Sequence, residues 1–423
     1  MAKLLKDLPA GSLVKEEGSK YYGKTIVWRV ISQNHPGYPK NSTTLLSEKI
    51  ISLKASDAKE PKNSDDYRSK YGNNRYIHSN IKQWLNSSAS SWYKAQHSAD
   101  EPPAGSGVTY NPYDSEKGFM ANLTPELRAA ILPTSLQVLK NDKDGGGLES
   151  FTDKIFLLSC TEVGLDNDTS YDEGAKFDYF KSNSDRVAYP TKDAIDNNTY
   201  TSDSLATNKG WYWWLRTPYS SSSHSEIVRY VYSGGSWDDH SAFNGYTGVR
   251  PALNLDSGIL VSDSPDSNGV YSIMWNQPPE KPGNISLPEM VISGQENEIS
   301  WPKATDPEGD KVSYKLERKV NNGSWTQVYQ GANTSYNDTV LRTHNTVQYR
   351  VRAYDIHGNE SDWTLSQAVD VVHNRPPKIS GEDKDLGVQT RGFEVPYTVS
   401  DEDGDKVTVV VRLNDKELSR ESI

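Results

Sequence analysis

The sequence predicts a mixed α+β domain over residues 1–275, an all-β sandwich over 276–373 and part of a second sandwich over 374–423. Three observations support this division. Hydrophobic residues make up only 34% of the chain, which is typical of β-rich domains with many loops. Helix-type patterns accompany strand-type patterns in the first 275 residues. Beyond that point, short alternating segments follow two proline-rich connectors that lie about a hundred residues apart.

Composition and charge indicate whether the chain folds and which classes of partner it is expected to bind. The 11 Trp and 25 Tyr residues supply apolar area for several cores, so the chain is expected to fold. The 57 acidic residues exceed the 46 basic ones, and the formal net charge is −11. Because binding to phosphate backbones needs clustered Lys and Arg, we expect no nucleic-acid partner. This charge is compatible with carbohydrate and protein partners.

The sequence also bears on compartment and redox chemistry. It contains no apolar run near the roughly twenty residues of a transmembrane helix, so membrane insertion is not expected. Residues 1–9 carry charge but no apolar core segment, and we expect no secretory signal there. The lone cysteine, Cys160, lies in an apolar segment (154–160) that predicts a buried strand. A core thiol is therefore expected, without a disulfide framework or a Cys-based metal site.

Local patterns predict the first secondary-structure elements. Lys24–Ile31 and Thr43–Ser47 have the composition of strands. Ser79–Leu85 predicts a helix that begins with a serine cap and places its apolar residues on one face. A second helix is predicted from Thr124, which precedes a proline in the first turn.

Two segments near the end of the first domain are the most informative. Trp211–Pro218 reads WYWWLRTP, and Gly248–Leu255 reads GVRPALNL. We expect the second segment to be the partner strand of the first, with the Trp cluster forming at least one wall of the core. Arg216 and Arg250 are expected to pair with buried carboxylates and so hold the two strands together.

The polar, aromatic-rich residues between these segments are the candidate ligand site. A rigid frame that carries a polar loop is a common arrangement for recognition. Aromatic faces beside Asp, Asn and Ser suit a sugar, and they suit a protein epitope equally well. The candidate ligand-binding residues are Tyr219, Tyr230, Tyr232, Trp237, Asp238, Asp239, His240, Asn244 and Tyr246.

Catalysis is the less favoured interpretation of the same residues. Asp238, Asp239 and His240 could form a carboxylate–imidazole set in a loop, but on a strand neighbouring side chains point to opposite faces. The sequence shows no metal-spaced histidine pair, nucleophile elbow or phosphate loop. We therefore expect no catalytic residues, no cofactor and no metal. A hydrolase acting on cell-wall glycans would need paired carboxylates that the sequence does not place.

An internal repeat defines the C-terminal part. Connectors at Asn276–Pro282 and Asn374–Pro377 both contain a proline pair. Each is followed by a matching motif, Asp306–Val312 and Asp401–Val407. The acidic turns invite a calcium-binding interpretation, but they lack the glycine position and downstream Glu of a helix–loop–helix site. A simple turn between strands is favoured.

The first repeat resembles a fibronectin type III domain. The residues that carry the resemblance are Trp301, Tyr349–Ala353 and Gly358–Trp363, within 278–373. The resemblance implies a β-sandwich of the immunoglobulin-like class that acts as a spacer or docking module. The second copy, from about residue 375, stops after roughly half a sandwich. We expect it either to continue beyond residue 423 or to complete its sheet with another subunit.

The first domain resembles a family of unknown function found in Gram-positive bacteria and their bacteriophages. Five motifs carry the resemblance: VWRV (27–30), TLLS (44–47), NIKQWLN (80–86), WLRTP (214–218) and GVRPAL (248–253). The last two also resemble C-type-lectin-like folds, in which a GGSW loop (here 234–237) and a final strand frame the ligand site. This implies a lectin-like α+β fold. The catalytic activity of the related sulfatase-modifying enzymes is not implied, because no matching cysteine lies between 211 and 255.

These observations lead to a functional expectation. We expect a non-enzymatic structural or adhesion protein of a phage particle, made in the host cytoplasm and located in the virion. Its expected partners are other virion proteins, copies of itself in a homo-oligomer, and a polysaccharide or protein of the host surface. The alternative is a secreted or cell-surface carbohydrate-binding protein of a Gram-positive bacterium. A cell-wall glycan hydrolase is the third interpretation, and the neighbouring genes would separate these classes.

Overall fold

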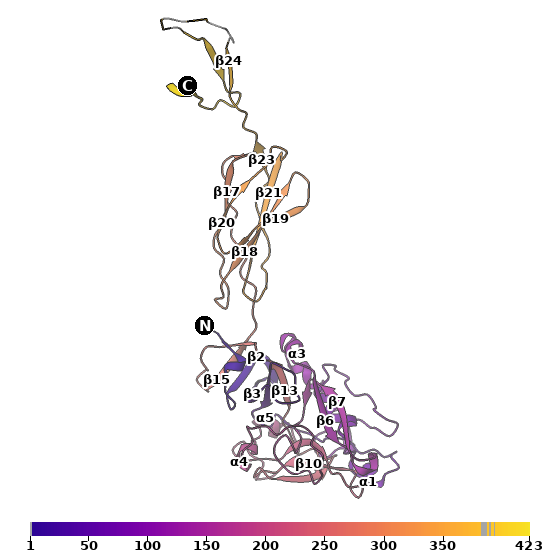
Figure 1. Cartoon of the computed structure of the whole chain (residues 1–423). Coiled ribbons are helices and arrows are strands. Elements are labelled where there is room, and N and C mark those ends of the chain that lie inside the picture. Colours follow the sequence, from indigo (N-terminus) through magenta and orange to yellow (C-terminus); the bar gives the residue numbers. More distant parts are fainter. Residues whose placement is uncertain (1, 382–386, 389–390, 393) are drawn as a thin grey trace. The chain divides into compact units, whose positions relative to one another are not determined.

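The computed structural model describes residues 2–381, 387–388, 391–392 and 394–423. It divides into two compact units, the first ending at Trp275 and the second beginning at Asn276. Each unit has its own hydrophobic core. In Figure 1 the first unit runs from indigo to pink and the second from orange to yellow. The first unit is mixed α+β with short helices, and the second consists of strands and loops.

The larger sheet of the first unit has eight strands. Neighbouring strands are antiparallel except for β15 and β2, which run parallel. In sheet order the strands are β1 (Lys3–Leu4), β14 (Leu260–Val261), β15 (Val270–Met274), β2 (Leu13–Tyr21), β3 (Lys24–Gln33), β4 (Ser42–Ser47), β13 (Ala252–Asp256) and β8 (Ile155–Phe156). The expected strands at Lys24–Ile31 and Thr43–Ser47 are thus β3 and β4.

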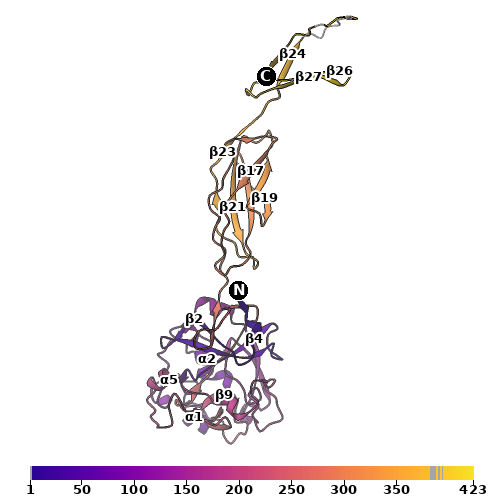
Figure 2. The same cartoon turned by 90° about the vertical axis from the view of Figure 1, so that its left-hand side faces the viewer.

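A second sheet of five strands lies on the opposite side of the same unit from β2 in Figures 1 and 2. Its strands in order are β11 (Trp237–Ser241), β10 (Ile227–Val231), β9 (Trp213–Pro218), β12 (Gly248–Val249) and β5 (Ser52–Leu53). A separate hairpin is formed by β6 (Thr134–Leu139) and β7 (Leu148–Asp153).

The helices of the first unit are short, and four of the five in the described residues begin at side-chain caps. Ser79 accepts a hydrogen bond from the Lys82 amide at the start of α2, and Thr124 accepts one from the Leu127 amide at the start of α3. Both predicted helices are therefore present. The helices are α1 (Asp66–Tyr71), α2 (Asn80–Leu85), α3 (Pro125–Ala130), α4 (Asn183–Arg186) and α5 (Lys192–Asp196). Single 3₁₀ turns occur at η1 (Leu5–Asp7), η2 (Tyr76–His78), η3 (Gly105–Gly107), η4 (Phe119–Asn122) and η5 (Asp142–Asp144).

The two signature segments pair differently from the prediction. The main partner of β9 is β10, and β12 meets β9 through one parallel pair, Gly248 with Trp213. The remainder of the second segment is β13, which belongs to the eight-stranded sheet. The segment therefore links the two sheets instead of forming one hairpin partner. Gly248 is required there, because a Cβ atom would lie 2.6 Å from the Tyr212 carbonyl oxygen.

The Trp-rich strand is buried on both faces. Trp214 packs in one core cluster, whereas Trp211, Trp213 and Leu215 pack in another. All four side chains are at most 2% exposed. Because successive residues on a strand point to opposite faces, this run fills two cores at once. Cys160 is also fully buried in the second cluster, but the strand there ends at Phe156, four residues earlier than predicted.

The second unit contains a sandwich of one larger sheet and one pair of strands. The larger sheet has the order β16-β23-β21-β18-β19, with β22 also on β21, and β17 pairs with β20. Their bounds are β16 (Val291–Ile292), β17 (Glu296–Ser300), β18 (Ser313–Val320), β19 (Trp325–Gly331), β20 (Ser335–Thr339), β21 (Thr346–Tyr354), β22 (Thr364–Leu365) and β23 (Val369–Val372). Trp301 packs in this core, beside Tyr314.

A buried polar cluster ties β18, β20 and β21 together. The Tyr349 hydroxyl donates to Asp338 Oδ2 at 2.7 Å, and Arg318 Nη1 donates to both carboxylate oxygens at 2.8 Å. We expect Tyr349→Phe to lower the free energy of unfolding of the second unit by about 1.5–3 kcal/mol, because it removes a hydrogen bond to a charged group. Calorimetry of the full chain checks this. An unchanged second-unit transition would contradict it.

The repeated Asp motifs form the same turn twice. Asp306 Oδ1 accepts from the amides of Glu308 and Asp310, each at 3.0 Å. Asp401 Oδ1 accepts from the amides two and four residues later at 2.9 and 3.1 Å. Asp403 in addition binds Arg375 at 2.7 Å. These carboxylates thus have partners within the chain, in keeping with the interpretation as turns.

The last part of the chain forms two hairpins. They pair β24 (Lys378–Gly381) with β25 (Tyr397–Ser400), and β26 (Thr408–Leu413) with β27 (Lys416–Ser422). Among the described residues after 373, Val409 is the only hydrophobic one that is buried. This segment thus lacks the core that the first sandwich has. Within the described residues, no helix has the length and apolar character needed to cross a membrane.

Candidate functional site

The candidate ligand residues lie mostly on a β-hairpin, where a loop was predicted. Residues 227–231 and 237–241 form β10 and β11, joined by a tight turn over 232–235 in which the Gly235 amide donates to the Tyr232 carbonyl oxygen. Gly235 has φ +86°, and a Cβ atom there would lie 1.9 Å from the Asn183 carbonyl oxygen. Only glycine fits this position, because it must be both left-handed and close to another backbone segment.

The pleat of this hairpin divides the predicted residues between two faces. Arg229 is paired with Asp239, and Tyr230 with Asp238, and residues directly opposite each other share a face. Tyr230, Asp238 and His240 therefore lie on one face, and Trp237 and Asp239 on the other. Asp238 and Asp239 consequently do not act as a pair.

The face that carries Trp237 and Asp239 surrounds a buried arginine. The Arg229 guanidinium is 3.9 Å from the centre of the Trp237 ring and 5.0 Å from that of Tyr219. Arg229 also binds Asp168, and its Nη1 lies 3.3 Å from Asp239. Because these rings and carboxylates already hold a cation, this part of the predicted site stabilises the hairpin.

The opposite face carries a continuous set of aromatic rings. We call the five tyrosines of this set that are exposed or partly exposed the aromatic surface: Tyr110, Tyr200, Tyr212, Tyr232 and Tyr246. Tyr200 stacks on Tyr246 with ring centres 4.6 Å apart, and Tyr212 stacks on Tyr232 at 5.2 Å. Tyr110 contacts both Tyr200 and Tyr246. Buried Trp211 lies 4.4 Å from Tyr212 and 6.1 Å from Tyr200, and so connects the two stacks.

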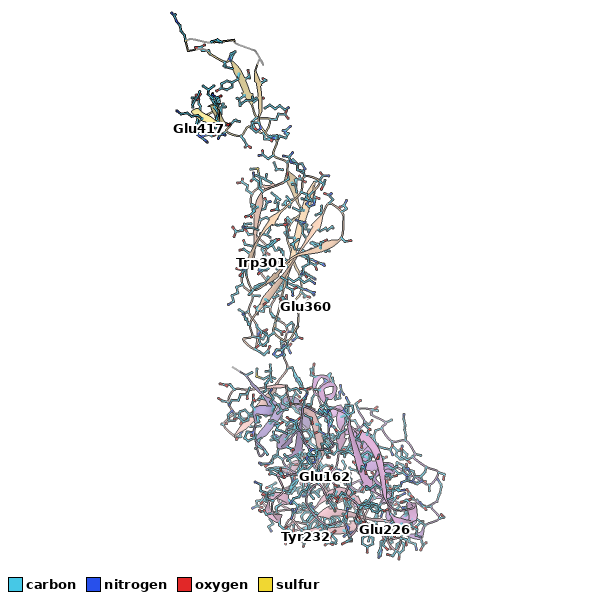
Figure 3. All side chains as sticks on the ribbon, in the orientation of Figure 1. Glu162, Glu226, Tyr232, Trp301, Glu360 and Glu417 are labelled. Atoms are coloured by element: carbon cyan, nitrogen blue, oxygen red, sulfur yellow. The ribbon has the colours of Figure 1, made fainter. Side chains whose placement is uncertain are left out.

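Exposure differs strongly within this face. Tyr110 and Tyr232 are 45% and 40% exposed, whereas Tyr230 is only 5% exposed. Figure 3 shows the labelled Tyr232 at the margin of the first unit. Tyr230 belongs to the core, packed edge-on against Trp214, and this burial weighs against its predicted role as a contact residue. The ring stacks could still hold the exposed tyrosines in place beneath a ligand.

Polar groups border the aromatic surface. Asp238 is exposed on the same face as His240. His240 Nε2 contacts the Tyr246 hydroxyl, and its Nδ1 contacts the amide of Asn244, which is itself buried. Burial lowers the pKa of His240 and so favours the neutral imidazole, which orients Tyr246 through its contact with the hydroxyl. The surface therefore offers stacking rings beside one exposed carboxylate, whose Oδ1 accepts from the Asp239 amide, and several hydrogen-bonding groups.

Three tyrosines of the aromatic surface are not among the residues predicted from the sequence. Tyr110 and Tyr200 come from loops 90 residues apart in the chain, and Tyr212 comes from the Trp-rich segment itself. A weak signal was present, since Tyr110 follows Thr109 and precedes Asn111, and Tyr200 follows Asn198 and Thr199. Large aromatics inside such polar loops favour an exposed position. The contact between the loops is nonlocal, which the sequence alone does not show.

A buried ion pair supports the strand behind this surface. Arg216 binds Glu162 through two contacts of 2.6 and 2.8 Å, and both side chains are 0% exposed. The remaining guanidinium N–H groups donate to the backbone oxygens of Gln137, Leu157 and Glu173. All five donors of Arg216 are therefore used, as predicted for an arginine paired with a buried carboxylate.

Arg250 departs from the corresponding prediction. Its Nε donates to the Ser47 carbonyl oxygen at 2.9 Å, and its guanidinium lies 5.1 Å from the Trp213 ring. Within the described part of the chain it forms no ion pair, because the nearby Glu48 binds Arg29 at 2.5 Å. Burial lowers the pKa of Arg250 to about 10. Its role is to join the link between β12 and β13 to the end of β4 through a backbone oxygen.

The geometry gives little support to catalysis. Asp238 and His240 share a face, but His240 is engaged by Tyr246 and Asn244. A separate pocket of about 370 Å³ lies near the β2–β3 hairpin and is lined mainly by apolar groups, including Tyr22, Ile26 and Val270. It contains none of the nine predicted ligand residues. The aromatic surface remains the best candidate for recognition.

The comparison with protein families identifies the first unit. The family model described as Domain of unknown function (DUF6273) matches residues 41–257, just over half of the chain. The chain belongs to this family. The DUF6273 domain includes β9, β12, the Glu162–Arg216 pair and the whole aromatic surface. No protein in the curated collection matches the chain.

The β-rich C-terminal part that follows the DUF6273 domain matches fibronectin type III domains. A Fn3-like protein from Clostridium thermocellum is 22% identical, covering 23% of this chain and 96% of that one, with a TM-score of 0.17. The FN1-FN3 domains of chicken CNTN1 are 14% identical, covering 35% and 66%, with a TM-score of 0.20. Titin kinase with its flanking domains is 21% identical, with a TM-score of 0.20. That match covers 22% of this chain and only 17% of the other.

Proposed function

We propose that this chain is a non-enzymatic recognition protein that binds carbohydrate through the aromatic surface of its DUF6273 domain. The observation that carries the proposal is the set of five exposed or partly exposed tyrosines, two stacked pairs with Tyr110 edge-on to one of them, bordered by Asp238 and His240. Stacking rings suit the apolar face of a sugar, and the neighbouring polar groups suit its hydroxyls. The domain is lectin-like in this functional sense.

The ring stacks favour a preorganised site. Tyr200 and Tyr246 are held by each other and by Tyr110, so little rotamer freedom is lost when a ligand stacks on them. The separation of Asp238 from Asp239 on opposite faces of β11 weighs against a glycan hydrolase, which needs two carboxylates flanking one bond. Binding without cleavage is the function that this arrangement supports.

We further propose that the protein works in a phage particle, with the fibronectin-type sandwich as spacer or docking module. The pairing of a binding domain with a sandwich that has its own core supports this arrangement. Antibody labelling of purified particles would test it. Labelling of the bacterial envelope without particles would favour the alternative, a surface or secreted carbohydrate-binding protein of a Gram-positive bacterium.

Replacing Tyr232 or Tyr246 by alanine should weaken binding to purified Gram-positive cell-wall polysaccharide by about tenfold each, equivalent to roughly 1.4 kcal/mol. Each change removes a ring that stacks on a neighbour and faces solvent. Binding is measured by titration calorimetry on the full chain.

The matched control is Tyr189→Ala. Tyr189 is 42% exposed, close to the 40% of Tyr232, and lies outside the aromatic surface. The Tyr189→Ala variant should bind the polysaccharide with the affinity of the unaltered protein. Equal weakening by the control, or retention of full affinity in both test variants, would exclude the aromatic surface as the binding site.

A further inference from the structure

Three carboxylates and an imidazole gather in the first unit, away from the aromatic surface. Glu60 and Asp100 are 1% and 7% exposed, and Asp57 is 1% exposed. His97 Nε2 lies 2.9 Å from Glu60 Oε1, with the imidazole side chain 25% exposed. One ligand atom from each of Glu60, His97 and Asp100 falls within 4.8 Å of the others.

Two atoms in this cluster have no hydrogen-bond partner. Asp100 Oδ1 is buried and unpartnered, although its other oxygen accepts from the Gln96 amide at 2.6 Å. His97 Nε2 is likewise buried without a hydrogen bond, despite its short distance to Glu60. Orphaned polar atoms are costly in a protein interior, and they need an explanation.

Several cations near this cluster pair with carboxylates outside it. The neighbouring cations have partners of their own: Lys62 binds Glu101, Arg68 binds Asp144 and Arg75 binds Glu149. His78 lies 5.2 Å from the His97 ring, and Lys59 lies over the Phe243 ring at 5.1 Å. Among these described groups, His97 is the one whose ring nitrogen directly contacts the Glu60 carboxylate.

The geometry points to a divalent transition-metal site, of the Zn²⁺ type, formed by Glu60, His97 and Asp100. Ligand atoms about 2.0–2.2 Å from one ion lie roughly 3 Å apart, as His97 Nε2 and Glu60 Oε1 do. An ion between the three groups would occupy the unpartnered Asp100 Oδ1 and His97 Nε2.

The donor set decides the class of metal. Imidazole suits Zn²⁺ and its neighbours in the first transition series, whereas Ca²⁺ and Mg²⁺ prefer oxygen ligands throughout. Asn63 and Asn73 donate side-chain hydrogen bonds to the Glu60 carboxylate. These bonds orient Glu60, which is the usual function of groups behind a metal ligand.

Such an ion would connect two segments that the fold brings together. Glu60 follows the stretch in which the Asp57 amide donates to the Ala242 carbonyl oxygen and the Lys59 amide to that of Gly107. His97 and Asp100 belong to a loop without regular secondary structure. The metal would therefore fasten this loop to the segment beside the end of β11.

Titration of the metal-free full chain with Zn²⁺ by calorimetry tests the site. We expect one equivalent to bind and the first-unit thermal transition to move to higher temperature, because Zn²⁺ binds the folded state. His97→Gln and Asp100→Asn should each lower the affinity by at least about tenfold. Ca²⁺ should not compete.

Asp100→Asn also separates metal binding from folding. It keeps the shape of the side chain and removes a buried negative charge, so without Zn²⁺ the variant should melt no lower than the unaltered chain. His224→Gln is the control, because His224 Nδ1 lies 3.4 Å from Glu226 in a more exposed place. The assignment fails if the unaltered chain binds no Zn²⁺ at 100-fold excess, or if His224→Gln, and not the other two, abolishes binding.

Discussion

Replacing Glu162 by alanine should lower the free energy of unfolding of the first unit by about 3–5 kcal/mol. The change removes the carboxylate that binds the fully buried Arg216 directly, which leaves backbone oxygens as its hydrogen-bond partners and Glu173 as a nearby carboxylate bonded to Thr217 and Leu139 instead. Tyr38, whose hydroxyl donates to Glu162 at 2.7 Å, would lose its acceptor as well. Calorimetry of the full chain measures the effect, with the second-unit transition as an internal reference.

The Glu162 prediction has two comparison variants. Glu162→Gln keeps the shape but removes the charge, and it should cost less than the alanine change. Glu360 pairs with Arg352 at 2.5 Å on the surface of the second unit, and Figure 3 labels both glutamates. Glu360→Ala should change the free energy of unfolding by less than about 1 kcal/mol, since exposed pairs contribute little. A Glu162→Ala effect as small as this would show that the buried pair is not needed.

Trp213→Ala should destabilise the first unit by a similar amount, about 3–5 kcal/mol. The side chain is 0% exposed, and its indole N–H donates to the Arg186 carbonyl oxygen at 2.9 Å. Its ring also covers Arg250, which has lost much of its hydration. Truncation would open a cavity. It would also leave the Arg186 carbonyl oxygen without the indole N–H and the Arg250 guanidinium without the covering ring. Urea unfolding monitored by far-ultraviolet circular dichroism provides the measurement.

The comparison for Trp213 is Trp325 in the second unit. Trp325 is partly exposed and packs against Arg350, so Trp325→Ala should cost less and should alter only the second-unit transition. Trp213→Phe should retain part of the lost stability. If Trp213→Ala instead lowered stability by less than 1 kcal/mol, the Trp-rich strand could not be the wall between two cores that the structure shows.

Elements set by local interactions could be predicted from the sequence. The helix after Ser79 and the helix after Thr124 both begin at the expected caps, because a side chain and an amide three residues on decide the start. The alternation of apolar residues over 347–354 likewise indicates a strand, and these residues lie in β21.

The candidate site could be predicted only in part. Tyr232 and Tyr246 lie on the aromatic surface, but Trp237 and Asp239 surround Arg229, and Tyr230 is in the core. Because a loop was expected at these residues, the alternation of strand side chains between two faces was not predicted. Recognising residues 227–241 as a hairpin would have divided them correctly, since the GGS turn is a hairpin signal.

The sequence by itself determined the mixed first unit, the sandwich after it, and the buried pairing of Arg216, because composition, turn residues and helix caps act over short distances. Only the tertiary structure decided that Gly248–Leu255 bridges two sheets, that Arg250 binds carbonyl oxygens, and that Tyr110 and Tyr200 meet Tyr246. Glu60, His97 and Asp100 likewise come together only through the fold. Such contacts depend on how sheets and loops pack. Packing brings together residues that lie at irregular distances along the chain, so no periodic sequence pattern marks them.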